Sequence, residues 1–330
     1  MTAPAGLVAA VRAGDRSSLA RLLTLVESGG EDARAALSAL GALPVRIADA
    51  VATVGITGAP GAGKSTLTDR LVGRLRADGD EVAVLAVDPT SPFTGGAILG
   101  DRVRMLRHET DPAVFIRSMA TRGHLGGLAR ATPQAIRVLA AAGFRWILVE
   151  TVGVGQVEVE IAGAADTTVV VVNPGWGDGV QASKAGLLEV GDVFVVNKAD
   201  RDGVAATVRD LQGMLALGGA RAWTPPVVET VATADRGIDE LHDAIAAHRG
   251  YLTASGELRV RRERRIADEL RALVLDRFLA RADDMCSGDR FAAAVRDVAA
   301  GLSDPYTAAT DLSDGADPDA DRRAERRGER

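Results

Sequence analysis

The residues best suited to chemistry lie in one short segment, Gly58-Ala-Pro-Gly-Ala-Gly-Lys64-Ser65, which fits the pattern G-x-x-x-x-G-K-[ST]. Glycines at these positions let backbone N–H groups turn inward around a polyphosphate. Lys64 brings a positive charge to the β- and γ-phosphates, and the Ser65 hydroxyl is placed to bind Mg²⁺. The segment therefore predicts a phosphate-binding loop (P-loop) for a nucleoside triphosphate.

The elements around this segment are those that such a loop needs. Residues 51–57 form an apolar, β-branched run typical of a buried strand, and after Ser65 apolar residues recur at helical spacing through Leu75. A loop between a strand and a helix N-terminus binds anions, because the first N–H groups of the helix point at the ligand. The alternative, a glycine-rich turn that matches by chance, does not explain the flanking strand and helix.

A second motif, Asn197-Lys-Ala-Asp200, directly follows the apolar run 193–196. The Asp200 carboxylate can accept hydrogen bonds from N1–H and the 2-amino group of guanine, whereas adenine offers neither donor. Adenine would leave the desolvated carboxylate unpaired, at a cost of about 1–3 kcal/mol or more. Asn197 and Lys198 would brace the pocket. We therefore expect GTP rather than ATP; an ordinary polar loop is the alternative.

Glu150 ends the apolar run 146–149 and opens Glu150-Thr-Val-Gly153. A carboxylate at the end of a buried strand suits a Mg²⁺ ligand, direct or through water, and Gly153 could offer its N–H to the γ-phosphate. Most GTPases have Asp at this position, so the longer side chain of Glu150 predicts a shifted or water-mediated metal contact.

Two glycine-rich loops, 88–101 and 173–184, also follow apolar strands, and the carboxyl edge of a sheet is where ligands bind in this class. Asp88 and Asp101 are candidates for the water shell of Mg²⁺. A turn residue before Pro89 and a helix N-cap are equally good interpretations of these two aspartates. The four histidines are scattered and Cys286 is the single cysteine, so we expect neither a transition-metal site nor a disulfide within the chain.

The chain has 330 residues, of which 47% are hydrophobic, and a net charge of −6. This length suits one large α/β domain with accessory helices, and the acidic balance argues against a nucleic-acid partner. No apolar run approaches the roughly 20 residues needed to span a bilayer, and the N-terminus shows no positively charged cluster followed by an apolar core, so we expect no signal peptide. We therefore expect a cytoplasmic protein without a membrane partner.

Apolar strand-like runs alternate with helical patterns through the middle of the chain, at 51–57, 82–87, 114–117, 146–150, 167–173, 193–197 and 226–230. This alternation predicts an α/β fold of the P-loop NTPase class, a mostly parallel sheet flanked by helices. The expected organisation is an N-terminal helical extension over 1–48, the P-loop domain over 49–250, a C-terminal helical extension over 251–303 and a disordered tail over 304–330. In the C-terminal extension, the arginine run 259–265 favours a solvated helix face over an anion site.

Six blocks occur in order along the chain: G-x-P-G-x-G-K-S, V-D-P-T-S-P-F-T-G-G-A-I-L-G-D-R-V-R-M, R-G-H-L-G-G-L-A, E-T-V-G-V-G-Q-V-E, G-D-G-V-Q-A-S-K-A-G and V-N-K-A-D. This set resembles the methylmalonyl-CoA mutase-associated GTPases of the MeaB/ArgK family, which includes the human MMAA-type proteins. The resemblance runs from about residue 5 to Tyr306. It implies a GTPase chaperone that gates adenosylcobalamin loading of an acyl-CoA mutase and protects it, and that forms a homodimer through its C-terminal helical extension. Methylmalonyl-CoA mutase is the favoured partner, with isobutyryl- and ethylmalonyl-type mutases as alternatives.

The resemblance also assigns residues. Mobile switch segments map onto 88–104, 152–160 and 175–188, and the family's serine in the base-contacting loop is replaced here by Val231. The backbone N–H of Ala232 could still reach guanine O6. The expected catalytic residues are Lys64, Asp88, Asp101 and Glu150, and the expected Mg²⁺ residues are Ser65, Asp88, Asp101 and Glu150. The residues expected at GTP are Gly58, Ala59, Pro60, Gly61, Ala62, Gly63, Lys64, Ser65, Thr66, Gly153, Asn197, Lys198, Asp200, Val231, Ala232 and Thr233.

The residue after Gly153 is Val154, where Ras-like enzymes have a glutamine that orients water, and the nearest glutamine is Gln156. We therefore expect slow intrinsic hydrolysis that a partner accelerates. Three hypotheses compete: a metallochaperone-type GTPase for another metalloenzyme, a transport-linked ATPase or kinase, and an adaptor whose nucleotide only sets its shape. The first requires a Cys/His metal motif that the sequence lacks, and Asp200 argues against the second.

Overall fold

The apolar runs of the sequence form one parallel sheet. The computed structural model describes residues 4–88, 107–108, 110–120, 131–151, 157–176, 181–217 and 222–314. Its strands are β1 (Ala52–Gly58), β2 (Val82–Asp88), β3 (Val114–Ala120), β4 (Trp146–Thr151), β5 (Thr167–Val172), β6 (Val193–Asn197) and β7 (Val227–Thr230). Within these residues the sheet has the order β3-β2-β4-β1-β5-β6-β7, and all neighbouring strands are parallel. All seven carboxyl ends therefore lie at one edge.

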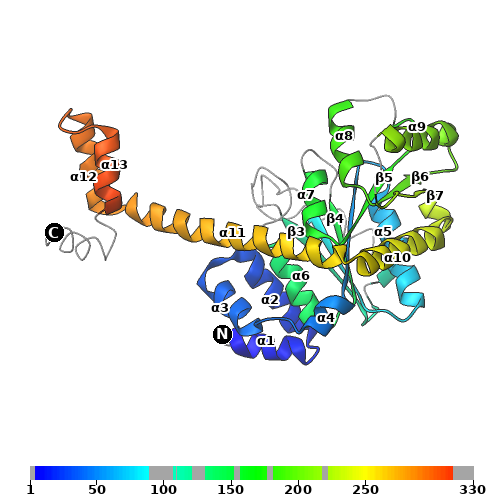
Figure 1. Ribbon diagram of the computed structural model, residues 1–330. Helices are drawn as coiled ribbons and strands as arrows, with labels where there is room; N and C mark the ends of the chain where they lie inside the picture. Colours follow the sequence, from blue (N-terminus) through cyan, green and yellow to red (C-terminus); the bar gives the residue numbers. More distant parts are fainter. Residues whose placement is uncertain are drawn as a thin grey trace. The chain divides into compact units, whose positions relative to one another are not determined.

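Helices cover both faces of this sheet (Figure 1). They are α5 (Lys64–Ala77), α6 (Thr132–Ala141), α7 (Val157–Ala164), α8 (Gln181–Val190), α9 (Val204–Leu217) and α10 (Ile238–Ser255). Helices α5 and α10 share one apolar core with the sheet, whereas α6 and α7 pack into a second core and α8 and α9 into a third. Strand β2 illustrates the alternation, because Val82 and Val84 belong to the first core and Ala83, Leu85 and Val87 to the second. The predicted α/β fold with flanking helices is confirmed.

The N-terminal extension is a group of helices, α1 (Pro4–Arg12), α2 (Arg16–Ser28), α3 (Gly30–Leu40) and the short α4 (Val45–Ala50). Leu22, Leu23 and Leu40 are buried here and belong to the same core as α6. Arg117 of the edge strand β3 adds an ion pair to Glu27 of α2 at 2.6 Å. The extension is thus part of the core rather than an appendage.

Two arginines of the run 259–265 are partly buried and paired with buried carboxylates, contrary to the expected solvated face. They lie near the start of α11 (Glu257–Met285). Arg261 contacts both carboxylate oxygens of Asp192 at 2.9 and 3.0 Å, and Arg262 contacts both of Asp166 at 2.7 and 3.2 Å. The two aspartates immediately precede β6 and β5 and are buried, so they need cationic partners. Arg259, with 81% of its side chain exposed, fits the original interpretation.

The chain divides into two compact units, Met1–Glu263 and Arg264–Arg330. In the second unit α11 continues, followed by α12 (Gly288–Ala299) and α13 (Pro305–Asp314), which pack together. The predicted disorder from residue 304 is wrong for its first part, because α13 forms there. Asp304 caps this helix by accepting hydrogen bonds from the N–H groups of Tyr306 and Thr307 at 2.9 and 3.1 Å. No helix in the described ranges combines the length and apolar character required to cross a membrane.

Candidate functional site

The segment Gly58–Ser65 connects β1, in the middle of the sheet, to α5, with two glycines that no other residue could replace without collision. A Cβ on Gly58 would lie 1.9 Å from the carbonyl oxygen of Val171 on β5, and a Cβ on Gly63 would lie 2.4 Å from Asn197 Nδ2. Both glycines have positive φ, +132° and +93°. The loop therefore packs directly on β5 and on the second predicted motif.

Lys64 is the first residue of α5 and is 7% exposed. Its Nζ donates to the carbonyl oxygens of Gly58 and Ala59 at 2.8 and 3.1 Å. The ammonium group is therefore folded back over the loop in which a polyphosphate would lie. A cation held there, together with the N–H groups at the start of α5, is suited to phosphate oxygens.

Ser65 and Glu150 come together from different elements. Glu150 lies on β4, paired with Ile56 of β1, and its Oε1 accepts a hydrogen bond from the Ser65 hydroxyl at 2.6 Å. Both residues are buried, at 5% and 2% exposure. Two oxygen donors side by side at the P-loop suit Mg²⁺, which takes few protein ligands and completes its shell with phosphate and water. The residues present therefore fit this ion, although the described ranges hold no cluster of three or more His, Cys, Asp or Glu side chains for a metal.

Asn197, at the end of β6, connects three segments of the site. Its Nδ2 donates to the Ala62 carbonyl of the P-loop at 2.8 Å, and its Oδ1 accepts from the Thr230 hydroxyl at 3.0 Å and from the Ala232 N–H at 3.2 Å. The side chain is 2% exposed. Phosphate loop and base-contacting loop are thus bonded to one buried amide.

Lys198 has a left-handed backbone, with φ +61°, and its Nζ donates to the Gly61 carbonyl at 2.6 Å. Asp200 follows two residues later and is exposed. A buried Asn that braces the loop, a Lys that lies along the P-loop and an accessible carboxylate form the arrangement expected of a guanine pocket.

The base-contacting loop differs from the expectation in one respect. The N–H of Ala232, in the short 3-10 helix η3 (Ala232–Ala234), donates to Asn197 Oδ1. A contact of this N–H with guanine O6 would therefore have to share or replace that hydrogen bond. Val231 is buried and contributes no hydroxyl, and Thr233 is exposed beside it.

Several predicted residues cannot be placed. Asp101 and Gly153 lie outside the described residues, as do Val154 and Gln156. Of the expected switch segments, residues 89–104, 152–156 and 177–180 are outside the description. The backbone of Asp88 ends β2 at the carboxyl edge beside β4, but its side chain is outside the description. The pairing of Ser65 with Glu150 and the contacts of Asn197 are thus the parts of the site that the structure brings together.

Sequence reasoning missed two residues of this edge. Thr230 anchors Asn197, and Arg236 donates from its Nη2 to the Ala199 carbonyl at 3.2 Å. Thr230 could have been found, since it ends the last strand directly before the expected base loop. Nothing in the sequence around Arg236 indicates its partner.

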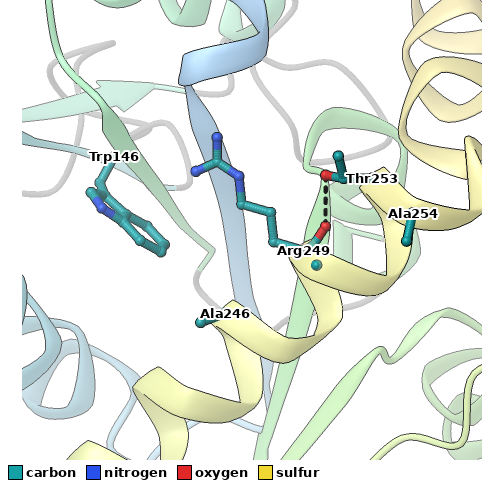
Figure 2. A pocket seen from close by; sticks show the side chains of 6 residues that line it. Trp146, Ala246, Arg249, Thr253 and Ala254 are labelled. Atoms are coloured by element: carbon teal, nitrogen blue, oxygen red, sulfur yellow. Dashed lines mark hydrogen bonds between the residues drawn. The ribbon is translucent and has the colours of Figure 1, made fainter.

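A pocket of about 440 Å³ lies away from this site (Figure 2). Its wall includes Trp146, the first residue of β4, so it lies at the amino edge of the sheet. Figure 2 shows Trp146 on one side and Arg249 of α10 on the other, with the Thr253 hydroxyl bonded to the Arg249 carbonyl at 2.9 Å. None of its lining residues belongs to a nucleotide motif, so we do not assign it to the nucleotide site.

Comparison with known proteins agrees with this geometry. A sequence profile of the family described as Methylmalonyl Co-A mutase-associated GTPase MeaB matches residues 19–286. The chain belongs to the MeaB family. The matched residues include the P-loop, Glu150, Asn197 and the base-contacting loop.

Individual relatives support the assignment to the MeaB family. A Pyrococcus abyssi protein that carries a GTPase name is 51% identical over 307 residues, covering 92% of this chain and 94% of that protein. GTPase ArgK of Escherichia coli is 39% identical over 273 residues, covering 79% and 80%. The mitochondrial methylmalonic aciduria type A homolog of Mus musculus is 38% identical over 216 residues, covering 64% of this chain and 52% of that protein.

A solved structure described as a LAO/AO transport system kinase shares the fold, with a TM-score of 0.67 and 29% identity over 94% of this chain and 96% of that one. Family, relatives and fold together make this chain a P-loop GTPase, which binds GTP and GDP.

Proposed function

We propose that this GTPase gates the loading of adenosylcobalamin into an acyl-CoA mutase and protects the loaded enzyme, with methylmalonyl-CoA mutase as the favoured partner. The family description, which names an association with methylmalonyl Co-A mutase, supports this proposal. So does the similarity to the mouse protein described as a methylmalonic aciduria type A homolog. In this proposal the protein acts in the cytoplasm, on no nucleic acid and no membrane.

The observation that carries the nucleotide part of the proposal is the set of three hydrogen bonds made by Asn197. They connect the loop that would hold the phosphates to the loop that would hold the base. A guanine nucleotide bound across both loops would contact the phosphate loop and the base-contacting loop, and Asn197 couples the positions of these two loops. Such a site distinguishes GTP from ATP by Asp200 and senses the phosphates at Lys64.

Hydrolysis would proceed by in-line attack of water on the γ-phosphate, giving GDP and inorganic phosphate. Lys64 and the N–H groups of the P-loop would neutralise the charge that develops on the phosphate oxygens, and catalysis would come mostly from this positioning. Ser65 and Glu150 would hold Mg²⁺, together with Asp88 and Asp101 through its water shell. The ion, when bound, supplies further charge neutralisation at the β- and γ-phosphates.

We propose that intrinsic hydrolysis is slow, because Val154 stands where a water-orienting glutamine would be. Contact with the mutase would then accelerate turnover. Arg102, Arg104 and Arg122, on loops expected to be mobile, are the candidates for added positive charge in the transition state. Surface ion pairing is the alternative role of these arginines.

The organisation of the chain in this proposal is an N-terminal extension over 1–48, a GTPase domain over 49–250, and a C-terminal extension over 251–303 that forms a homodimer. One face of α11 supports the dimer. Its large apolar side chains are between 42% and 62% exposed, and they are Ile266, Leu270, Leu273, Val274 and Phe278. A contiguous exposed apolar stripe of this kind is typical of an interface.

Light scattering on the purified protein tests the dimer. We expect the mass of two chains for the parent and of one chain for Phe278→Asp, with Arg271→Asp on the same helix as the control. A single-chain mass for the parent would contradict it.

Reconstitution with apo methylmalonyl-CoA mutase tests the proposed function itself. Adenosylcobalamin loading would be followed by its absorbance in the presence of this protein and GTP, GDP or a non-hydrolysable GTP analogue. We expect loading to depend on which nucleotide is present, and Lys64→Ala to lose that dependence. If Lys64→Ala behaves like the parent, the adaptor hypothesis is favoured. If the protein changes neither loading nor inactivation of the mutase, the partner is a different metalloenzyme.

A further inference from the structure

The base-contacting loop is closed by its own backbone. The N–H of Val231 donates to the Arg236 carbonyl at 2.9 Å, and the N–H of Arg236 donates to the Val231 carbonyl at 3.3 Å. This bridge holds residues 231–236 as one small unit between β7 and α10. Because Val231 has no hydroxyl, the loop cannot be tied to the neighbouring motif through that side chain.

Two adjacent side chains at the end of this unit reach different parts of the site. Asp235 Oδ2 lies 2.8 Å from Arg70 Nη1 on α5, the helix that begins with Lys64. Arg236 Nη2 donates to the carbonyl of Ala199 at 3.2 Å. Asp235 has a left-handed backbone, with φ +56°, which lets the side chains of Asp235 and Arg236 extend toward different elements. The pair therefore ties the base loop to the P-loop helix and to the Asn197–Asp200 motif.

Ala199 is the residue directly before Asp200, and both of its backbone groups are bonded to the base-loop region. Its N–H donates to the Thr230 carbonyl at 2.9 Å, and its carbonyl accepts from Arg236. The peptide plane between Ala199 and Asp200 is thus oriented by the guanidinium group. Asp200 is exposed, so the orientation of this peptide plane sets the direction in which the Asp200 side chain leaves the backbone.

We propose that Arg236 is a positioning residue for guanine recognition. It orients the Ala199–Asp200 peptide so that the Asp200 carboxylate meets N1–H and the 2-amino group together, and in this chain it supplies the tie that Val231 cannot make. The inference rests on the guanine site proposed above. It concerns discrimination between bases and leaves the phosphate chemistry at Lys64 and Glu150 untouched.

The test compares GTP with ITP, whose base retains N1–H and lacks the 2-amino group. Arg236→Ala, Arg236→Lys and the control Arg201→Ala would be assayed for GTP and ITP dissociation constants and for kcat at saturating GTP. Arg201 is an exposed arginine on the same turn as Asp200, and its removal controls for the loss of local positive charge. Thermal unfolding of each variant checks that the fold is intact.

For Arg236→Ala we expect GTP binding to weaken about fivefold, as for the loss of one hydrogen bond, with a smaller change for ITP. The preference for GTP over ITP therefore shrinks while kcat stays within about twofold of the parent, and Arg201→Ala keeps the parent preference. Arg236→Lys retains a donor group and the positive charge, so its preference for GTP over ITP should lie between those of the parent and of Arg236→Ala. Adding Val231→Ser to Arg236→Ala should recover part of the preference.

Equal weakening of GTP and ITP would overturn the inference, because a merely structural role loosens both nucleotides alike. An unchanged GTP preference in Arg236→Ala would also overturn it. A parent protein that binds no guanine nucleotide would instead contradict the proposed function. That outcome is distinguishable because it appears before any variant is compared.

Discussion

Buried carboxylates lie at both edges of the sheet, and different kinds of group contact them. At the amino edge, Asp166 and Asp192 are each held by an arginine of α11 through two contacts. At the carboxyl edge, Glu150 meets the hydroxyl of Ser65. Removing one partner of a buried ion pair destabilises the fold, because the other charge stays buried. A carboxylate placed beside a hydroxyl at a phosphate loop suits a cation that comes with a ligand.

The comparison teaches that burial of charge does not by itself mark a functional site. All three carboxylates are at most 6% exposed. Among the residues that the structure describes, the partner of the two aspartates is a guanidinium group and the partner of Glu150 is a hydroxyl. The two edges should therefore respond in opposite ways to removal of a charge. Two substitutions test this directly, and two further experiments probe one edge each, in order from the largest expected effect to the smallest.

Asp166→Asn should lower the free energy of unfolding by about 3 kcal/mol, because it removes the buried counter-charge of the Arg262 guanidinium, which keeps an ion pair to the exposed Asp49 at 3.4 Å. GTP turnover per folded molecule should stay within about twofold of the parent. Urea denaturation and a GTPase assay measure the two quantities. Loss of activity without loss of stability would break the comparison at this edge.

Glu150→Gln should show the reverse pattern. We expect turnover to fall about 100-fold, a loss typical of one electrostatic group in an active site, with stability equal to that of the parent or higher. Phosphate release at saturating GTP and Mg²⁺ measures the rate, and urea denaturation measures the stability. A variant that hydrolyses GTP normally but unfolds easily would show that Glu150 is a structural carboxylate like Asp166.

Gly63→Ala should weaken nucleotide binding about tenfold, because the new Cβ would lie 2.4 Å from Asn197 Nδ2 and displace its hydrogen bond to Ala62. Gly79→Ala is the matched control, since Gly79 has a similar φ of +84° and no atom within 4 Å of its added Cβ. Both variants place a Cβ on a residue of similar positive φ, so backbone strain is matched between them. Calorimetry with GDP should therefore find the affinity loss in the first alone, and equal losses would refute the bridging role of Asn197.

The smallest expected effect is the pH dependence of stability that His248 contributes at the amino edge of the sheet. Burial lowers the pKa of His248 below the ordinary 6.5. The Asp192 carboxylate, 3.3 Å from Nε2, raises this pKa, but by less than burial lowers it. Among weaker influences, Arg261 lowers the pKa, and Glu257 and Asp166 raise it. The folded protein therefore keeps this imidazole neutral where the unfolded chain binds a proton. The free energy of unfolding should fall as the pH drops below 6.5, by up to about 1.4 kcal/mol per pH unit.

Denaturation of the parent and of His248→Gln between pH 7.5 and 5.5 measures this contribution. The glutamine variant should lose part of the pH slope, because the proton taken up on unfolding is removed. Identical slopes would show that the neutral state of His248 does not contribute.

The features predicted from the sequence were those encoded locally. The P-loop, the strand that ends at Glu150 and the motif from Asn197 to Asp200 each occupy a few consecutive residues, and strands can be recognised by continuous apolar runs. The parallel order then brings their carboxyl ends to one edge. These steps need only short-range patterns and the general rules of parallel sheets.

The features that were missed depend on distant partners. Arg261 and Arg262 meet carboxylates 69 and 96 residues earlier in the chain, so a run of arginines could not be distinguished from a solvated face. The hydrogen bond of the Ala232 N–H to Asn197 depends in the same way on loop geometry. Helix α13 was missed because it contains few large apolar residues, and Asp304 caps its first turn.

The most direct test of the account uses a nucleotide that the parent should not accept. An amide at position 200 can donate to the 2-oxo group of xanthine, so Asp200→Asn should bind and hydrolyse XTP in place of GTP. In the reconstitution with methylmalonyl-CoA mutase, we predict that Asp200→Asn gates adenosylcobalamin loading with XTP and not with GTP, and that the parent does the opposite. Loading that ignores the exchange of nucleotide would contradict the claim that guanine binding at this edge controls the mutase.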